Sequence, residues 1–188
     1  MVQSHSSVAI LLYHTQMNAF LLVRQFRPPV YANLLQEWPD NEATHPTPPP
    51  LEEAFVFELC AGLVDKPGLS LREIASEEVM EETGYSVPAT ELRQVASFLT
   101  SVGLSGSRQT IFAANVDENC LCSRSQELQG GGGLASHGEA IDVVALPVSS
   151  IDDFLVDETI PKSAGLMFSL LWGKERVEAN GGRGLFVK

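Results

Sequence analysis

The stretch of sequence that decides the fold runs Ala61-Gly-Leu-Val-Asp-Lys-Pro-Gly-Leu-Ser-Leu-Arg-Glu-Ile-Ala-Ser-Glu-Glu-Val-Met-Glu-Glu-Thr-Gly-Tyr85. Its second half predicts a helix over residues 70–83, because Ser70 suits the N-cap position and Glu73 can complete a capping box. Gly84 stands where helices commonly end on a left-handed residue. The sequence therefore predicts both where this helix starts and where it stops.

The predicted helix carries acidic residues on its core-facing side. Each residue advances about 100° around a helix, and on that count Leu71, Ile74 and Ala75 define an apolar stripe. Glu78 and Glu82 fall within the same stripe. We therefore expect two carboxylates to lie among buried residues.

The neighbouring acids lie differently, with Glu81 at the edge of the stripe and Glu77 further away. Like charges four residues apart destabilise a helix by roughly 0.2–0.5 kcal/mol, and burial adds a cost unless a counter-charge is near. No Lys or Arg lies between Glu73 and Leu92 to supply one. Oxygen ligands without nearby His or Cys suit a hard divalent cation, Mg²⁺ or Mn²⁺. The alternative is a solvated acidic face, which the placement on the apolar side weakens.

The rest of the chain predicts strands around this helix. Residues 8–13 and 20–26 are β-rich apolar runs that predict a hairpin, which stops at Arg27-Pro-Pro. Five prolines in residues 37–50 predict an exposed loop. The remaining expectations are strands at 54–59, 95–99, 110–116 and 141–146, a flexible loop at 130–133, and a last helix from Pro161 to about Arg176. This pattern predicts a single domain, residues 1–188, with a mixed α/β layer fold.

The composition describes an acidic globular chain. Among 188 residues, 12 are Lys or Arg and 24 are Asp or Glu, so the net charge of −12 disfavours binding to nucleic acid or anionic membranes. No apolar run reaches the ~20 residues of a membrane span, and the first residues do not resemble a secretory signal. Three cysteines are too few for a disulfide framework, and we expect a cytoplasmic protein.

Residues 62–85 resemble the Nudix box. That box reads Gly, five residues, Glu, seven residues, Arg-Glu, an apolar residue, any residue, Glu-Glu, any residue, Gly and an apolar residue. The closing half matches through Glu78, Val79, Glu81, Glu82, Gly84 and Tyr85.

Two departures from the box affect its loop. The spacing from Gly62 to Gly84 is one residue longer, near Pro67-Gly68. In addition, Gly68 or Leu69 replaces the early Glu, and Glu77 replaces the Arg. In the family this Glu and Arg form a salt bridge with each other, so the departures concern loop geometry and leave the metal-binding glutamates in place.

Other blocks resemble the branch of the Nudix family that cleaves ADP-ribose and nucleotide sugars. They occur in the same order along nearly the whole chain, at 23–31, 58–65, 67–71, 102–109, 130–134 and 160–162. ADP-ribose-specific relatives usually carry a proline in the loop corresponding to Ser101-Val-Gly103, and its absence favours the UDP-sugar enzymes. The resemblance implies the Nudix fold, an α/β/α sandwich around a mixed β-sheet.

The resemblance also implies a metal site. Glu78 and Glu82 would be metal ligands, and Glu81 would be a third, shared or water-mediated one. The carbonyl of Ala61 and the loop carboxylate of Glu139 would complete a set that holds Mg²⁺, with Mn²⁺ as the other candidate.

The catalytic residues implied are Glu81, Glu82 and Glu139, because metal-assisted hydrolysis needs a group that activates water. The general base stays open between Glu139, a box glutamate and His137. A solvated loop carboxylate is an equally weighted interpretation of Glu139, and a loop histidine without function is the favoured interpretation of His137.

Three residues are expected to bind the substrate. Arg27 and Arg108 would contact phosphates or the sugar, and Glu58 would contact hydroxyl groups. The alternative for each arginine is a surface or strand-edge residue that balances excess acid, and for Glu58 it is pairing with a neighbouring strand. For Arg24 the two interpretations stay equal.

The expected activity is Mg²⁺-dependent hydrolysis of the pyrophosphate bond of a nucleoside diphosphate sugar, with UDP-glucose giving UMP and glucose 1-phosphate. ADP-ribose, giving AMP and ribose 5-phosphate, is the alternative substrate. A non-catalytic binding protein of the same fold is a distant alternative, because the box glutamates are retained. Relatives form homodimers through strands before the equivalent of residues 8–13, so we expect a homodimer whose mode is open, since this sequence begins near that strand.

Overall fold

The computed structural model describes residues 5–37, 48–122, 131–132 and 141–187. The strands in this part are β1 (Ser7–His14), β2 (Ala19–Phe26), β3 (Phe55–Glu58), β4 (Cys60–Leu63), β5 (Arg93–Leu99), β6 (Arg108–Val116), β7 (Gly131–Gly132) and β8 (Ile141–Pro147). The α-helices are α1 (Pro28–Glu37), α2 (Leu71–Thr83), α3 (Ile151–Val156) and α4 (Ala164–Ala179), and short 3-10 turns are η1 (Leu51–Ala54), η2 (Glu118–Cys120) and η5 (Val148–Ser150).

The described strands form one mixed sheet in the order β5-β6-β1-β2-β8-β7. β1 lies near its middle, parallel to β6 and antiparallel to β2. Residues 8–14 of β1 are all buried. A strand that is covered on both faces must be apolar at every position, which explains why residues 8–13 form a continuous apolar run.

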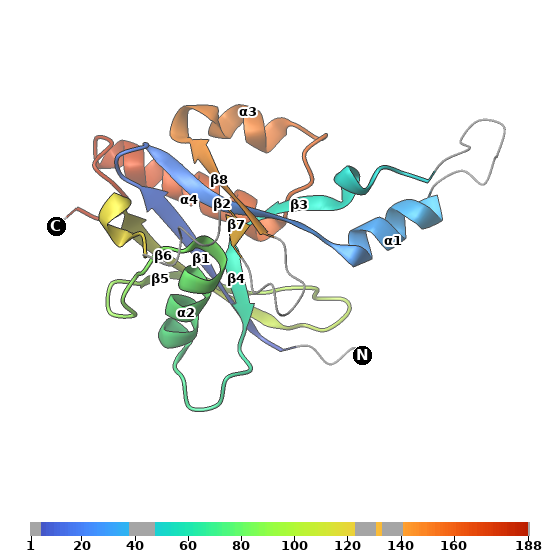
Figure 1. Ribbon diagram of the computed structural model, residues 1–188, viewed down its shortest axis with the longest axis horizontal. Coiled ribbons are helices and arrows are strands. Elements are labelled where there is room, and N and C mark those ends of the chain that lie inside the picture. The colour runs from blue at the N-terminus through green and yellow to red at the C-terminus, as the bar shows by residue number, and fades with distance from the viewer. Residues whose placement is uncertain (1–4, 38–47, 123–130, 133–140, 188) are drawn as a thin grey trace.

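The middle of the sheet is split, and this split positions the site. β1 and β2 are paired at their hairpin end, through residues 12–14 and 19–21. Beyond that point the chain from β3 to β4 crosses the gap, because β3 pairs with β2 and β4 pairs with β1. Residues 55–63 are thereby held between two central strands (Figure 1).

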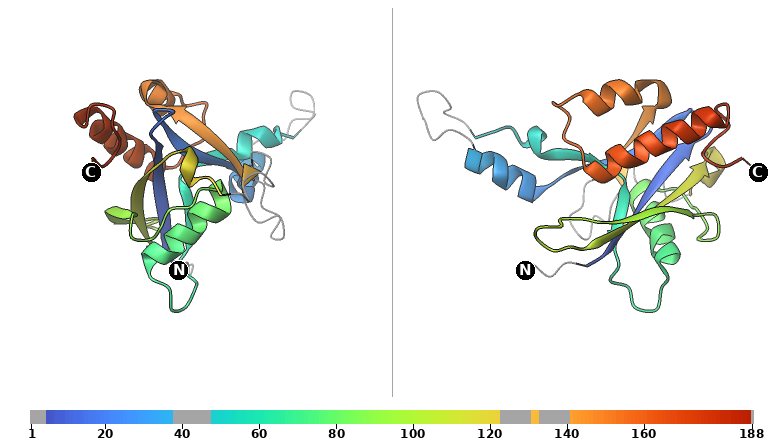
Figure 2. Two further views of the ribbon diagram at one scale, coloured as in Figure 1. Left: turned by 60° about the vertical axis from the view of Figure 1, so that its left-hand side comes forward. Right: turned by 180° about the vertical axis from the view of Figure 1, so that it is seen from behind.

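Helices cover both faces of the sheet, as Figures 1 and 2 show. On one face α2 inserts Ile74, Ala75 and Val79 into a core shared with β1 and β6. On the other face α3 and α4 pack against a second core. Gly173 lets α4 approach closely, since a Cβ there would lie 2.8 Å from Leu11 and Phe20. The expected α/β/α sandwich around a mixed sheet is confirmed.

Several elements differ from the prediction. Helix α1 was missed, because its first two residues are Pro28 and Pro29, which also fit a strand end. The last helix begins at Ala164 with Ser163 as its N-cap, so Pro161 precedes it. Helix α3 and strand β4 were also missed, and two residues of the predicted glycine loop pair with β8 as β7.

Some predictions fall outside the described residues. They are most of the proline-rich loop, at 38–47, and the loop positions His137 and Glu139. In the part of the chain that the structure describes, no helix combines the length and apolar character needed to cross a bilayer.

Candidate active site

Helix α2 has both ends defined by its own residues. The Ser70 side chain accepts a hydrogen bond from the Glu73 N–H, while the Glu73 carboxylate accepts one from the Ser70 N–H at 2.7 Å. This interaction with Ser70 lowers the pKa of Glu73. At the other end Gly84 has φ of 74°, and its N–H donates to the Met80 carbonyl. The caps fix which residues are helical, and packing of Ile74, Ala75 and Val79 into the core sets the direction of each acid.

The acids on α2 lie as the helical spacing predicts. Glu82 is buried, and the exposed fraction of the side chain rises from 13% at Glu78 to 34% at Glu81 and 46% at Glu77. Leu71 is the exception to the apolar stripe, because it is 38% exposed at the first turn. The inward placement of two carboxylates is therefore confirmed.

Glu82 connects α2 to the backbone of β4, the strand that lies in the gap between β1 and β2. Its Oε2 accepts a hydrogen bond from the Ala61 N–H at 3.0 Å. Ala61 lies opposite Ala9 of β1 with this N–H turned away from β1. In an antiparallel pair the N–H and C=O of one residue point to the same side, so the Ala61 carbonyl also faces away from β1. This is the orientation that the expected metal ligand requires.

Glu78 packs directly against the backbone of Gly62. A Cβ at position 62 would overlap the Glu78 carboxyl group. Gly62 therefore leaves room for the Glu78 carboxylate against β4, and Glu78 lines the same cleft as Glu82.

A lysine from the loop before α2 supplies the counter-charge that the helix lacks. Lys66 Nζ donates to Glu77 at 2.9 Å and lies 3.6 Å from carboxylate oxygens of both Glu78 and Glu81. Hydrogen bonding to Glu77, followed by the charges of Glu78 and Glu81, raises the pKa of Lys66. The sequence did not predict this contact, because Lys66 lies before the helix and reaches its acids only through the path of the loop between β4 and α2.

Arg27 and Glu58 form the opposite wall. Arg27 Nε donates to Glu58 Oε1 at 2.8 Å, and Nη2 donates to Oε2 at 2.5 Å. Pairing of β2 with β3 brings the two residues together. Such a two-bond fork fixes both planes, so these residues present one rigid unit to the site.

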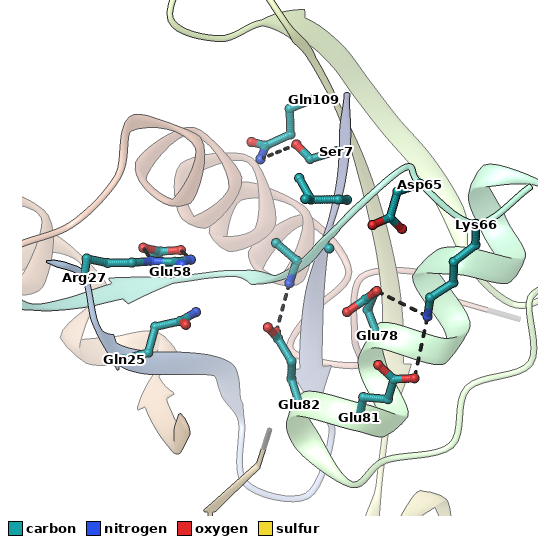
Figure 3. Close-up of a pocket in the computed structure, with 13 residues that line it drawn as sticks. Ser7, Gln25, Arg27, Glu58, Asp65, Lys66, Glu78, Glu81, Glu82 and Gln109 are labelled. Atoms are coloured by element: carbon teal, nitrogen blue, oxygen red, sulfur yellow. Dashed lines mark hydrogen bonds and ion pairs between the residues drawn. The ribbon is translucent and has the colours of Figure 1, made fainter. Parts of the chain in front are cut away.

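These groups share one cleft of about 750 Å³ (Figure 3). Of the predicted site residues, it brings together Ala61, Glu78, Glu81, Glu82, Arg27 and Glu58. Lining residues that the sequence did not single out are Ser7, Gln25, Leu63, Asp65, Lys66 and Gln109.

All of the missed residues except Ser7 had a signal in the sequence. Gln25, Leu63, Asp65 and Gln109 lie in the blocks that resemble the family, and Lys66 lies within residues 62–85. Ser7 had none: it reaches the cleft because the β1–β6 register places it beside Gln109, which donates to its hydroxyl at 3.2 Å.

Other predicted residues lie elsewhere. Arg108 does not line this cleft and donates to the Ser97 hydroxyl at 3.3 Å, so its contact with substrate stays a prediction. Glu139 and His137 lie outside the described residues, between β7 and β8. Arg24 does not line the cleft, and its Nη1 lies 3.5 Å from Asp142 Oδ2, so the two interpretations of Arg24 stay open.

Cys60 is buried beneath the acids. Burial and, next, the charge of Glu82 hold the pKa of its thiol well above the usual value. A thiol in this environment is not nucleophilic, so Cys60 serves as a small core residue.

Comparison with known proteins identifies the family. No family model matches the chain. The chain is 40% identical over 180 residues to the uridine diphosphate glucose pyrophosphatase NUDT14 of Bos taurus, covering 91% of this chain and 78% of the relative. The chain belongs to the Nudix family.

Other relatives of this Nudix hydrolase are more distant. The chain is 32% identical over 158 residues to the GDP-mannose pyrophosphatase of Pectobacterium atrosepticum, covering 84% of this chain and 67% of the relative. It also superposes on the crystal structure of an ADP compounds hydrolase with a TM-score of 0.60, covering 94% of this chain and 75% of the other. At 18% identity, this last likeness shows the fold alone.

Nudix hydrolases generally use divalent metal ions, and the donor set in the cleft fits such an ion. Three carboxylates and a backbone carbonyl offer only oxygen, the donor that Mg²⁺ and Mn²⁺ prefer. Within residues 5–37, 48–122 and 141–187, no three acidic, His or Cys side chains form a ready-made metal group. The reason is visible in Figure 3: Glu82 is turned to the Ala61 N–H, and Glu78 and Glu81 face the Lys66 ammonium.

Proposed function

We propose that this Nudix hydrolase cleaves the pyrophosphate bond of UDP-sugars, with UDP-glucose giving UMP and glucose 1-phosphate. The observation that supports it is the convergence of the α2 carboxylates and the Arg27–Glu58 pair on one cleft of about 750 Å³. That volume is within the range of pockets that bind small molecules. The relative at 40% identity, named for UDP-glucose, supports this choice of nucleotide sugar.

The proposal assigns the metal, Mg²⁺ or Mn²⁺, to Glu78, Glu81, Glu82, the Ala61 carbonyl and Glu139. When bound, a divalent metal polarises phosphoryl oxygens and lowers the pKa of a coordinated water. The 3.0 Å hydrogen bond from Ala61 holds the Glu82 carboxylate against β4, so that this ligand stays oriented.

Hydrolysis adds water across the P–O–P linkage. The water oxygen bonds to one phosphorus, and the bridging oxygen leaves with the other phosphate. A protein group must accept the proton from the water. We assign this role to Glu139, with His137 and a box glutamate as the other candidates.

The Arg27–Glu58 pair lies across the cleft from the α2 acids (Figure 3) and is assigned to orient the substrate. The Arg27 side chain is 42% exposed, so part of its guanidinium is accessible while the fork to Glu58 holds it in place. Arg108 is retained as a third substrate contact, on the resemblance alone.

A homodimer and a cytoplasmic location belong to the same proposal. None of residues 28–36 in α1 is buried in the single chain, and α1 projects from the sheet with η1 (Figures 1 and 2), which supports contact with a second copy. All three cysteines are free thiols, which supports a reducing compartment. Light scattering after size-exclusion chromatography tests the dimer.

The substrate is tested with purified protein and Mg²⁺ on UDP-glucose, ADP-ribose and GDP-mannose at equal concentration, with the products identified. We expect UDP-glucose to have the highest kcat/KM. Faster turnover of ADP-ribose or GDP-mannose would reassign the substrate. Absence of turnover on all three, with binding retained, would favour the non-catalytic alternative.

A further inference from the structure

Lys66 is the cation nearest to the α2 acids among the described residues that line the cleft. Its ammonium has one close partner, Glu77 at 2.9 Å, and two more distant ones, Glu78 and Glu81, each at 3.6 Å. Figure 3 shows the side chain reaching from the loop between β4 and α2 toward Glu78 and Glu81. One ammonium thus balances two of the expected metal ligands, Glu78 and Glu81, and Glu77, an acid outside the expected ligand set.

The conformation of the loop allows the Lys66 side chain to extend toward the α2 acids. Gly68, two residues after Lys66, has φ of 87°, a left-handed conformation that favours glycine. Lys66 is 34% exposed at its side chain, so the ammonium is partly screened by solvent and can move. The Glu77 carboxylate, at 46%, is more exposed still and lies on the outer side of the helix.

We propose that Lys66 is a tethered cation that competes with the divalent metal for Glu78 and Glu81, and that Glu77 is the partner that retains it when the metal binds. This inference rests on the proposed metal site. A divalent ion at the Glu78 and Glu81 oxygens would lie within several ångström of the ammonium, and like charges at that distance repel. Binding therefore requires Lys66 to leave its two longer contacts while keeping its shortest one.

Lys66 also stabilises the metal-free protein. Glu78 and Glu82 are four residues apart on one helix face, and the Glu78 carboxylate is only 13% exposed at its side chain. Without a nearby cation these acids repel one another and destabilise α2. Lys66 supplies a positive charge in the metal-free protein, so the stability of the fold does not depend on bound metal.

The test is Mn²⁺ binding, measured by electron paramagnetic resonance or calorimetry without substrate. We expect Lys66→Gln to lower the Kd for Mn²⁺ by about tenfold, because one repelling charge is removed at short range. Glu77→Gln has the opposite effect and raises the Kd a few-fold, because Lys66 then bonds more fully to Glu78 and Glu81. When Lys66 is already replaced by Gln, adding Glu77→Gln changes the Kd for Mn²⁺ by less than about twofold.

A charge-matched control is Lys174→Gln on α4, which removes a lysine paired with Asp152 at 2.6 Å and leaves the Kd unchanged. Thermal unfolding gives a second readout: metal-free Lys66→Gln melts at a lower temperature than the wild type, and saturating Mn²⁺ raises its Tm by more. An unchanged or raised Kd in Lys66→Gln overturns the proposal. Absence of Mn²⁺ binding to the wild type overturns the metal site itself, so the two failures are distinguishable.

Discussion

Replacing Glu82 by Gln separates the chemistry of the site from its structure. Glutamine keeps a carbonyl oxygen that can accept the Ala61 N–H, now bonded to Glu82 at 3.0 Å. A hydrogen bond to a charged acceptor contributes about 1.5–3 kcal/mol and one to a neutral acceptor about 0.5–1.5 kcal/mol, so roughly 1 kcal/mol is lost. Relief of repulsion from Glu78, four residues earlier, returns roughly 0.2–0.5 kcal/mol.

The free energy of unfolding of Glu82→Gln is therefore expected within about 1 kcal/mol of the wild type, a Tm shift of about 2–4 °C at this chain length. Activity falls far more, because a neutral amide is a poor ligand for a hard cation. We expect kcat/KM for UDP-glucose to fall at least about 100-fold, which is roughly 2.7 kcal/mol of transition-state stabilisation.

The assays are urea denaturation and steady-state hydrolysis of UDP-glucose at saturating Mg²⁺. Glu77→Gln is the comparison on the same helix, because its side chain is 46% exposed and points outward, and its loss at saturating Mg²⁺ stays below about tenfold. Equal losses in the two variants, or near-normal turnover by Glu82→Gln, would refute the assignment of inward and outward acids. A loss of stability above about 3 kcal/mol would show that Glu82 is chiefly structural.

Three further changes test other parts of the site. Gly62→Ala places a methyl group on the Glu78 carboxyl group, and we expect about 1–3 kcal/mol of destabilisation with at least about tenfold lower activity, whereas Gly103→Ala in open space leaves the stability unchanged. Arg27→Lys cannot reproduce the two bonds to Glu58, so KM rises about tenfold with a smaller change in kcat. Because folding lowers the pKa of Glu73, its ionised carboxylate stabilises the fold at pH values above its ordinary pKa of 4.5. This stabilisation is lost as the pH falls through the lowered pKa of the folded state. The free energy of unfolding should therefore fall less steeply with acid in Glu73→Gln than in the wild type.

Local signals explain which elements were predicted well. The α2 boundaries follow from Ser70, Glu73 and Gly84, whose effects act over four residues or fewer. The start of the last helix was predicted wrongly, because Pro161 suits the first helical position and Ser163 suits the N-cap. In the packed structure Ser163 is the N-cap. Helix α1 carries none of these caps and contacts η1 and, through the Phe26–Tyr31 ring pair, the end of β2.

The candidate site divides in the same way. The inward acids could be predicted because helical spacing is local and regular. The Arg27–Glu58 pair and the Lys66 contacts could not, since they join residues 31 and 11 or more positions apart through the sheet register and a loop path. Glu58 was expected to touch substrate, with pairing as its alternative, and the structure shows that it pairs with Arg27.

By itself, the sequence determined the helix α2, the face on which its glutamates lie and the acidic character of the chain, because spacing and composition are properties of neighbouring residues. Only the tertiary structure decided what those glutamates meet: the Ala61 N–H at the split between β1 and β2, the bare backbone of Gly62, and the Lys66 ammonium. The physical reason is that burial and charge compensation depend on distances between segments that no local pattern encodes.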